Sequence, residues 1–454
     1  MQVFKKFRKS IMLFLKLALT VAMLFSFLSV LEVFYSLPLF GTMTSGVLLL
    51  SYLVFLITFN MLYGGYLIGI NRLHEIIYSQ SLAVLFTNLI VYFELCLLYR
   101  SMVAVSPILL NLLVQIGFVF IGSYCLNRVY FKLYPVRRII AVFEDEASGG
   151  ALIRKMSKIP ERFKVSRGVS LLRYSVEEIK ELIGDYDGVI ICDIDKNIKH
   201  DILRYCYINM KRVYVLPSSS DIILGSSYPI QIIDAPVLMC RNRGLTAEQQ
   251  TIKRFFDIVF SLMGIIITSP IMLIVALSIK LCDGGPILFK QNRITKNGEI
   301  FNVLKFRSMI VNADKYGGRT ASEQDKRITA VGRVIRPLRI DELPQLFNIL
   351  FGSMSFVGPR PERIENVYEY TSRYPDFNLR HRVKAGLTGY AQIYGKYNTS
   401  PEDKLKMDLM YIERYSLLMD IRLVLMTIKI LFMRESTEGF KDGAQPKMRD
   451  DKEN

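Results

Sequence analysis

The sequence predicts a membrane protein of mixed α and α/β class. Four long apolar stretches open the chain, strand-like and helix-like runs alternate in its middle, and a fifth apolar segment precedes a basic C-terminal region. Of the 454 residues, 51% are hydrophobic, and 58 basic residues exceed 41 acidic ones to give a net charge of +17. A basic excess on so apolar a chain indicates contact with anionic lipid, nucleic acid or phosphorylated substrates.

Histidine and cysteine usage excludes two classes of protein. The three histidines and six cysteines are scattered, and the spacings CxxC, HxxxH and HExxH do not occur. A zinc enzyme and a secreted disulfide-rich protein are therefore not expected. The basic residues stand beside apolar segments and lack aromatic stacking motifs, so we expect membrane and phosphate partners and no nucleic acid.

The first 130 residues are predicted to form a four-helix transmembrane bundle. A bilayer core about 30 Å thick requires about 20 apolar residues in a helix, and four stretches come close to this length: Ile11–Leu31, Gly46–Ile70, Leu82–Tyr99 and Ser106–Leu126. Basic residues precede the first stretch and follow the fourth, whereas the loop of residues 32–45 has none. Both ends of the bundle are therefore predicted to be cytoplasmic, although Arg100 in the third loop runs against this pattern.

Residues 137–245 are predicted to form a small Rossmann-like parallel α/β domain. Strand-like runs alternate with helix-like segments, and Ser175 with Glu178 gives one helix a capping-box signature. The predicted strands are Ile139–Phe143, Val189–Cys192 and Val213–Leu216, and the predicted helices are Ser175–Ile183 and His200–Met210.

The loop after the first of these strands does not have the form of a phosphate-binding loop. It carries the carboxylates of Glu144, Asp145 and Glu146, and its glycines are not spaced as GxGxxG. Three negative charges would repel a pyrophosphate. We therefore expect a structural or regulatory module that does not bind NAD or UDP.

Residues 251–281 are predicted to form a re-entrant membrane helix. The segment Ile258–Ile279 is uncharged and long enough to cross, but Ser269-Pro270 near its middle should bend it. Basic residues flank both ends, and a full crossing would place the basic chain that follows outside the cell. A helix that enters and leaves by the cytoplasmic face satisfies these observations, and an ordinary kinked span remains the alternative.

The region 282–436 is predicted to be a mostly helical catalytic domain, followed by a polar tail at 437–454. Adjacent carboxylates, Asp341 and Glu342, follow Arg336, and Lys305, Arg307 and Arg360 are predicted to converge from other loops. Two carboxylates among cations suit Mg²⁺ bound to a diphosphate, with one carboxylate left to attack. The alternative is that one carboxylate is solvated and the other structural.

Four motifs give this region a family resemblance: Lys305-Phe306-Arg307-Ser308-Met309, Asp341-Glu342-Leu343-Pro344-Gln345, Gly358-Pro359-Arg360-Pro361-Glu362 and Gly386-Leu387-Thr388-Gly389-Tyr390-Ala391-Gln392. With Asp283–Arg293, they resemble the bacterial sugar transferases, the monotopic polyprenyl-phosphate phosphoglycosyltransferases. The resemblance runs from about Lys253 to Phe432. The bundle and α/β domain before it resemble those of the long-form members that initiate exopolysaccharide or capsule synthesis.

The resemblance implies a reaction and a role for each matched residue. Asp341 would attack the β-phosphorus of a UDP-sugar, UMP would leave, and undecaprenyl phosphate would accept the sugar phosphate held on Asp341. Glu342 would be the partner of Mg²⁺, and Arg336, Arg360, Lys305 and Arg307 would contact phosphates. The resemblance further implies a bacterial plasma-membrane protein with a cytoplasmic catalytic domain.

The sequence leaves open the sugar that is transferred, the oligomeric state and one competing function. Ala385-Gly386 stands where the family commonly has Pro-Gly, and Tyr390 stands where Trp is frequent, so sugar recognition is expected to differ. The sugar is glucose, galactose or an acetamido sugar, and a homodimer through the N-terminal half is expected. The competing hypothesis is a catalytically inactive membrane scaffold or sensor of the polysaccharide assembly machinery.

Overall fold

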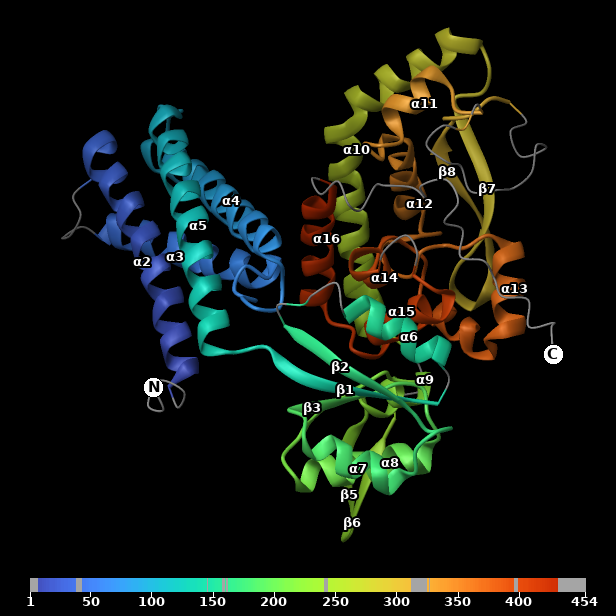
Figure 1. The fold of residues 1–454 in the computed structure, drawn as a ribbon. Coiled ribbons are helices and arrows are strands. Elements are labelled where there is room, and N and C mark those ends of the chain that lie inside the picture. The colour runs from blue at the N-terminus through green and yellow to red at the C-terminus, as the bar shows by residue number, and fades with distance from the viewer. Residues whose placement is uncertain are drawn as a thin grey trace. The chain divides into compact units, whose positions relative to one another are not determined.

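The protein is represented by a computed structural model that describes residues 7–37, 43–144, 146–156, 160, 162–240, 244–311, 325, 327–395 and 399–431. The chain divides into two compact units, Met1–Leu216 and Pro217–Asn454 (Figure 1). The predicted tail at 437–454 and the last residues of the predicted catalytic domain lie outside the described residues.

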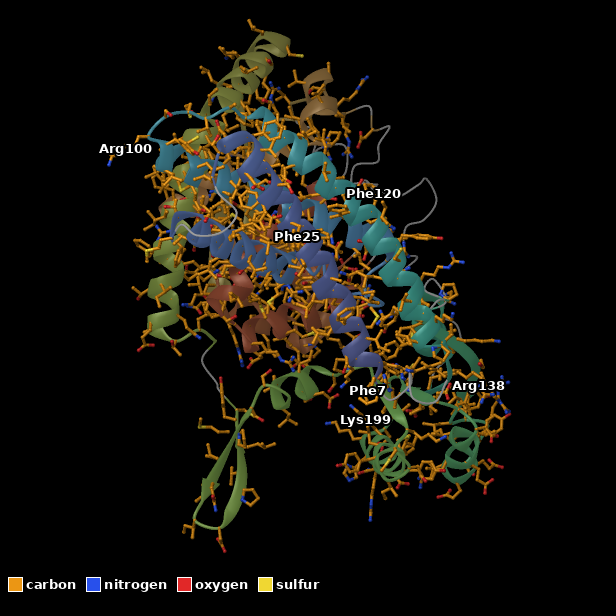
Figure 2. The ribbon with its side chains drawn as sticks, turned by 90° about the vertical axis from the view of Figure 1, so that its left-hand side faces the viewer. Phe7, Phe25, Arg100, Phe120, Arg138 and Lys199 are labelled. Carbon is orange, nitrogen blue, oxygen red and sulfur yellow. The ribbon has the colours of Figure 1, made fainter. Side chains whose placement is uncertain are left out.

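The first unit opens with four long helices that match the four apolar stretches. They are α2 (Arg8–Tyr35), α3 (Met43–Tyr63), α4 (Leu73–Tyr99) and α5 (Ser106–Leu133). Figure 2 shows Phe7 and Arg100 at opposite ends of these helices. Large apolar side chains such as Phe25 and Phe120 stay exposed on the outer surface, as lipid-facing residues do. Together with α10 (Ala247–Asp283) of the second unit, five helices in the described part of the chain are long and apolar enough to cross a bilayer, which indicates a membrane protein.

A buried polar network joins these four helices. Gln115 Nε2 donates to the Tyr52 hydroxyl at 2.7 Å, and Asn88 Nδ2 donates to Gln115 Oε1 at 2.8 Å. Asn111 Nδ2 donates to Asn88 Oδ1 at 2.9 Å, and Ser26 Oγ donates to Asn111 Oδ1 at 3.0 Å. Side-chain amides that bond across helices fix the packing of a membrane bundle at the level where they meet.

The rest of the first unit is a parallel α/β domain. Its strands are β1 (Arg137–Phe143), β2 (Phe163–Ser170), β3 (Gly188–Ile191) and β4 (Arg212–Val215), paired in parallel in the order β2-β1-β3-β4. Its helices are α6 (Glu146–Met156), α7 (Val176–Gly184) and α8 (Lys196–Ile208). Residues from β1 and β3 are buried from both faces, as the central strands of a parallel sheet require.

The predicted strands and helices of this domain are confirmed, and β2 and α6 are additions. The capping box of α7 is formed: the main-chain N–H of Ser175 donates to Glu178 Oε2 at 2.8 Å, and that of Glu178 donates to Ser175 Oγ at 3.3 Å. The strand β2 was not predicted because Phe163–Ser170 has no apolar run and is mostly exposed until its last two residues.

The second unit contains a helical domain with three short strand pairs. The antiparallel pairs are β5 (Tyr228–Ile232) with β6 (Ala235–Met239) and β7 (Leu288–Ile294) with β8 (Ile300–Phe306), and the parallel pair is β9 (Ser355–Val357) with β10 (Gly386–Thr388). The helices are α9 (Ser219–Leu224), α10 (Ala247–Asp283), η1 (Lys296–Gly298), α11 (Ala330–Ile335), η3 (Ile340–Glu342), α12 (Gln345–Phe351), α13 (Ile364–Arg373), η4 (Pro375–Arg382), α14 (Tyr390–Tyr394), α15 (Pro401–Glu413) and α16 (Leu417–Leu431).

The predicted break at Ser269-Pro270 is a bend inside one helix, because α10 runs without interruption through both residues. Figure 1 shows α10 changing direction along its length. Proline at 270 cannot donate to the carbonyl of Ile266, four residues earlier. The Ser269 hydroxyl donates to that same carbonyl at 2.8 Å, so the orphaned acceptor is satisfied and the helix continues.

Both halves of α10 pack against the same domain. Before the bend, Lys253 pairs with Asp420 of α16 at 2.5 Å, and Arg254 donates to the Ile349 carbonyl of α12 at 2.6 Å. After the bend, Met272 and Ile279 belong to one buried cluster with residues of β8 and α11. The two ends of this apolar helix therefore contact one compact body.

Candidate active site

The adjacent carboxylates lie on a tight turn between two helices. Thr329 caps α11 by accepting from the Gly332 N–H at 3.0 Å, and the chain then turns into η3, which carries Asp341 and Glu342. Arg339, directly before η3, has a φ of 54°. A side chain other than glycine is uncommon in this left-handed region, and such residues concentrate where a site requires a particular turn.

Glu342 is paired with two cations from separate elements. Lys305, from β8, approaches Glu342 Oε1 at 2.8 Å, and Arg360, from the loop after β9, approaches the same oxygen at 3.0 Å. Burial by itself would raise the pKa of Glu342, but the charges of Arg360 and Lys305 outweigh it and hold that pKa well below its usual range. Glu342 is thus an anion that organises the cations around it.

Asp341 is in the opposite electrostatic situation. Burial raises its pKa to about 6, and the negative charge of Glu342 adds to the effect, while Lys305 and Arg336 act against it. No ion pair of Asp341 is found among the residues that the structure describes. A carboxylate that is poorly solvated and unpaired is more nucleophilic than one held in a salt bridge.

The structure brings together three of the four predicted phosphate-contacting residues. Lys305 and Arg360 meet at Glu342, and the charge of Arg336 acts on Asp341. Arg307 is placed differently: it is buried, and its Nε donates to the Pro286 carbonyl at 2.7 Å. Its guanidinium also lies against Gly285, where an added Cβ would be 2.8 Å from Nη1. Arg307 therefore fixes the segment that leads into β7.

Interlocked glycines hold the Arg360 loop in place. The Gly358 N–H donates to the Thr388 carbonyl at 2.9 Å, and the Gly386 N–H donates to the Pro359 carbonyl at 2.9 Å. A Cβ on Gly386 would fall on the main-chain nitrogen of Gly358, and one on Gly389 would fall on the Gly358 carbonyl. Only glycine allows the two backbones to approach this closely.

A buried ion pair behind this loop was not predicted from the sequence. Arg380, from η4, is 2.8 Å from Asp408 of α15, and both side chains are almost fully buried. A signal was present: Asp408 lies on the same helix face as Leu405, Leu409 and Ile412, all buried. A carboxylate within an apolar stripe indicates a buried cationic partner.

The second unit is similar in sequence to known proteins. The family model described as bacterial sugar transferase matches residues 248–434. The chain is also 37% identical over 187 residues to the uncharacterized sugar transferase EpsL of Bacillus subtilis, covering 41% of this chain and 90% of that protein. The chain belongs to the bacterial sugar transferase family.

Two longer family members bear names that state a reaction. The chain is 43% identical over 183 residues to the UDP-N-acetylgalactosamine-undecaprenyl-phosphate N-acetylgalactosaminephosphotransferase of Aeromonas hydrophila, covering 40% of this chain and 43% of that protein. It is 36% identical over 211 residues, 45% of each chain, to the UDP-glucose:undecaprenyl-phosphate glucose-1-phosphate transferase of Klebsiella pneumoniae. The chain thus spans less than half the length of these relatives.

Proposed function

We propose that this sugar transferase moves a sugar 1-phosphate from a UDP-sugar to undecaprenyl phosphate and releases UMP, as the first step of exopolysaccharide or capsule synthesis. One observation carries the proposal: Asp341, a half-buried carboxylate without an ion pair among the described residues, stands beside a carboxylate whose one oxygen accepts from both Lys305 and Arg360. The names of the Aeromonas hydrophila and Klebsiella pneumoniae relatives support the substrate classes.

Two displacements at phosphorus would complete the reaction. A carboxylate oxygen of Asp341 forms a bond to the β-phosphorus of the UDP-sugar, the phosphoanhydride bond breaks, and UMP leaves with the electron pair. An oxygen of undecaprenyl phosphate then attacks the same phosphorus, and the bond to Asp341 breaks. The aspartate is regenerated as a carboxylate, and the product is a sugar-linked undecaprenyl diphosphate.

The cations of the site would bind and orient the diphosphate. Phosphoryl transfer is accelerated mainly by positioning and by positive charge around the transferring group. Lys305 and Arg360 are held by Glu342, and the charge of Arg336 acts on Asp341 itself. Arg307 would position the backbone before β7 rather than contact phosphate.

Mg²⁺ fits the carboxylates of this site if substrate phosphates supply its other ligands. Within the described ranges, no group of three or more His, Cys, Asp or Glu residues is able to hold a metal, so a cage made of protein alone is not formed there. Mg²⁺ commonly binds one or two carboxylates together with substrate phosphates. Glu342, with Asp341 beside it, would hold the ion, which would neutralise phosphate charge when bound.

The proposal is tested by UMP release from a panel of UDP-sugars. Purified full-length protein with undecaprenyl phosphate and Mg²⁺ should release UMP from one or a few of UDP-glucose, UDP-galactose, UDP-N-acetylglucosamine and UDP-N-acetylgalactosamine. A catalytically inactive scaffold or sensor would release no UMP from any of these UDP-sugars. If no member of the panel yields UMP while the protein stays folded, the scaffold hypothesis is favoured.

The rate should depend on pH through Asp341. Its pKa is raised from the ordinary 3.8 to about 6, so kcat/KM for UMP release should fall about tenfold per pH unit below pH 6. The folded state binds this proton more tightly than the unfolded chain does, so protonation of Asp341 raises the free energy of unfolding as the pH falls from 6 to 4. Protonation of Asp341 therefore does not unfold the protein, and unfolding from this cause does not explain the fall in kcat/KM. A profile that is flat down to pH 5 would contradict the assignment.

The membrane arrangement is also part of the proposal. We propose four spans formed by α2–α5 and a re-entrant α10, with the catalytic domain on the cytoplasmic side of a bacterial plasma membrane. Packing of both halves of α10 on one domain supports entry and exit on the same face. The Rossmann-like α/β domain would be a structural or regulatory module, and a homodimer is proposed.

Labelling of an introduced tag tests the re-entrant helix. A tag at Asn454 and one at Asp195 should both be protected from a membrane-impermeant reagent in intact cells. Pro270→Ala restores the N–H that α10 lacks, so it should straighten the helix and expose the tag at Asn454 in part of the molecules. Pro401→Ala, at the first turn of α15, is the matched control and should change nothing. External labelling of the unmodified chain at Asn454 would overturn the re-entrant arrangement.

A further inference from the structure

The Arg360 loop is held through its carbonyl groups. Pro359 and Pro361 flank Arg360 and have no N–H to donate, so the usual main-chain donors are lacking on both sides. Three successive carbonyls accept instead: that of Pro359 from the Gly386 N–H at 2.9 Å, that of Arg360 from Arg380 Nη2 at 3.0 Å, and that of Pro361 from Arg293 Nη1 at 3.0 Å. The guanidinium groups of Arg380 and Arg293 thus supply two of the three donors that hold this loop.

Arg380 is itself fixed from the other side. Its Nε donates to Asp408 Oδ2 at 2.9 Å, and its Nη2 lies 2.8 Å from the same oxygen. Its Nη1 is 4.0 Å from Glu362 Oε1. A planar guanidinium with several donors in a rigid fork sets direction as well as distance. One buried side chain therefore joins α15 and η4 to the main chain of Arg360.

Stability alone does not account for this pair. Arg380 and Asp408 are 2% and 1% exposed, and a buried ion pair often contributes no more to folding than apolar residues of similar volume. The pair does supply a fixed geometry at the main chain of Arg360. The Arg360 side chain leaves that point to approach Glu342 at 3.0 Å while remaining 42% exposed, and so reachable by a ligand.

We propose that Arg380, anchored by Asp408, is a positioning residue of the active site: it fixes the main chain at Arg360 and thereby aims the Arg360 guanidinium at Glu342 and at the substrate diphosphate. The inference rests on the proposed function, since it assigns Arg360 to the diphosphate of a UDP-sugar. The need for Arg380 and Asp408 cannot be seen from the sequence motif around Arg360. Displacement of a binding group by about 1 Å can cost about 100-fold in rate.

A double-mutant cycle on UMP release tests this dependence. Full-length protein carrying Arg380→Lys, Arg360→Ala or both is assayed for kcat and KM with the UDP-sugar, and its melting temperature is measured. Because Arg380 acts through Arg360, each single change should lower kcat/KM by about 100-fold, and the double variant should match Arg360→Ala. Arg373→Lys, in a surface pair with Glu369 at 3.6 Å, is the control and should retain wild-type values.

The cycle separates failure of the inference from failure of the proposed function. If both single losses are large and they multiply in the double variant, Arg380 does not act through Arg360 and the inference is overturned alone. If Arg360→Ala releases UMP as the wild type does, Arg360 has no role at the diphosphate and both are overturned. Should Arg380→Lys not fold, Asp408→Asn takes its place in the same cycle, with the same coupling expected. Losses in kcat/KM that multiply in that double variant would again overturn the inference.

Discussion

Asp341→Asn should abolish UMP release, with a loss of more than about a thousandfold, whether or not the lipid acceptor is present. The substitution keeps the shape of the side chain and removes the anionic oxygen that would bond to phosphorus. Since Asp341 is on a 3-10 turn directly before α12 and has no ion pair within the described structure, its removal should leave the fold intact. The measurement is UMP release by the purified variant at saturating UDP-sugar.

One further variant separates the charge of Asp341 from its position, and a second is a control elsewhere in the domain. Asp341→Glu keeps the negative charge but moves it by about one methylene, which should also spoil in-line attack in a preorganised site. Asp376→Asn, at an exposed position in the first turn of η4, removes a carboxylate elsewhere in the same domain and should leave the rate unchanged. Substantial UMP release by Asp341→Asn would exclude Asp341 as the nucleophile.

Gly386→Ala should destabilise the catalytic domain by more than about 3 kcal/mol and eliminate activity. The added Cβ would overlap the main-chain nitrogen of Gly358 and crowd the Thr388 carbonyl, and main-chain atoms have no rotamer with which to move away. Relief requires separation of β9 from β10, which carries the Arg360 loop out of place. The measurement is the melting temperature of the detergent-solubilised protein, together with UMP release.

Gly184→Ala is the matched control for this change. Gly184 ends α7, has no left-handed φ, and a Cβ there would meet nothing within 4 Å. Its replacement should be neutral or slightly stabilising, because alanine restricts the unfolded chain more than glycine does. If Gly386→Ala melts within a degree or two of Gly184→Ala, the two loops are not interlocked as described.

Local patterns were sufficient for the four long helices and for most of the α/β domain, but not for the details of α10 and η3. Long apolar runs predicted α2–α5, and the capping box at Ser175 predicted the start of α7. Proline at 270 predicted a bend, yet the continuous helix depends on the Ser269 hydroxyl reaching Ile266. The turn at Asp341 likewise depends on a left-handed Arg339, for which the residue type gives no indication.

The site could be predicted only as far as its motifs extend. The Asp341-Glu342 pair and the cations Lys305 and Arg360 were found because they lie in motifs that resemble those of the bacterial sugar transferases. That Arg307 binds the Pro286 carbonyl, and that Arg380 binds the Arg360 carbonyl, depends on contacts between residues separated by 20 positions or more. Such contacts are set by packing of the whole domain, which short patterns do not record.

The central claim is that a sugar phosphate is held on Asp341 during turnover, and intact-mass analysis tests it most directly. Wild-type protein and Asp341→Asn are each incubated with UDP-sugar and Mg²⁺ without undecaprenyl phosphate. We expect stoichiometric UMP and a sugar-phosphate adduct on the wild type alone, mapped to the peptide that contains Asp341. UMP released only when undecaprenyl phosphate is present, with no adduct trapped, would contradict it. That result would indicate direct transfer, with Asp341 as a base or metal ligand.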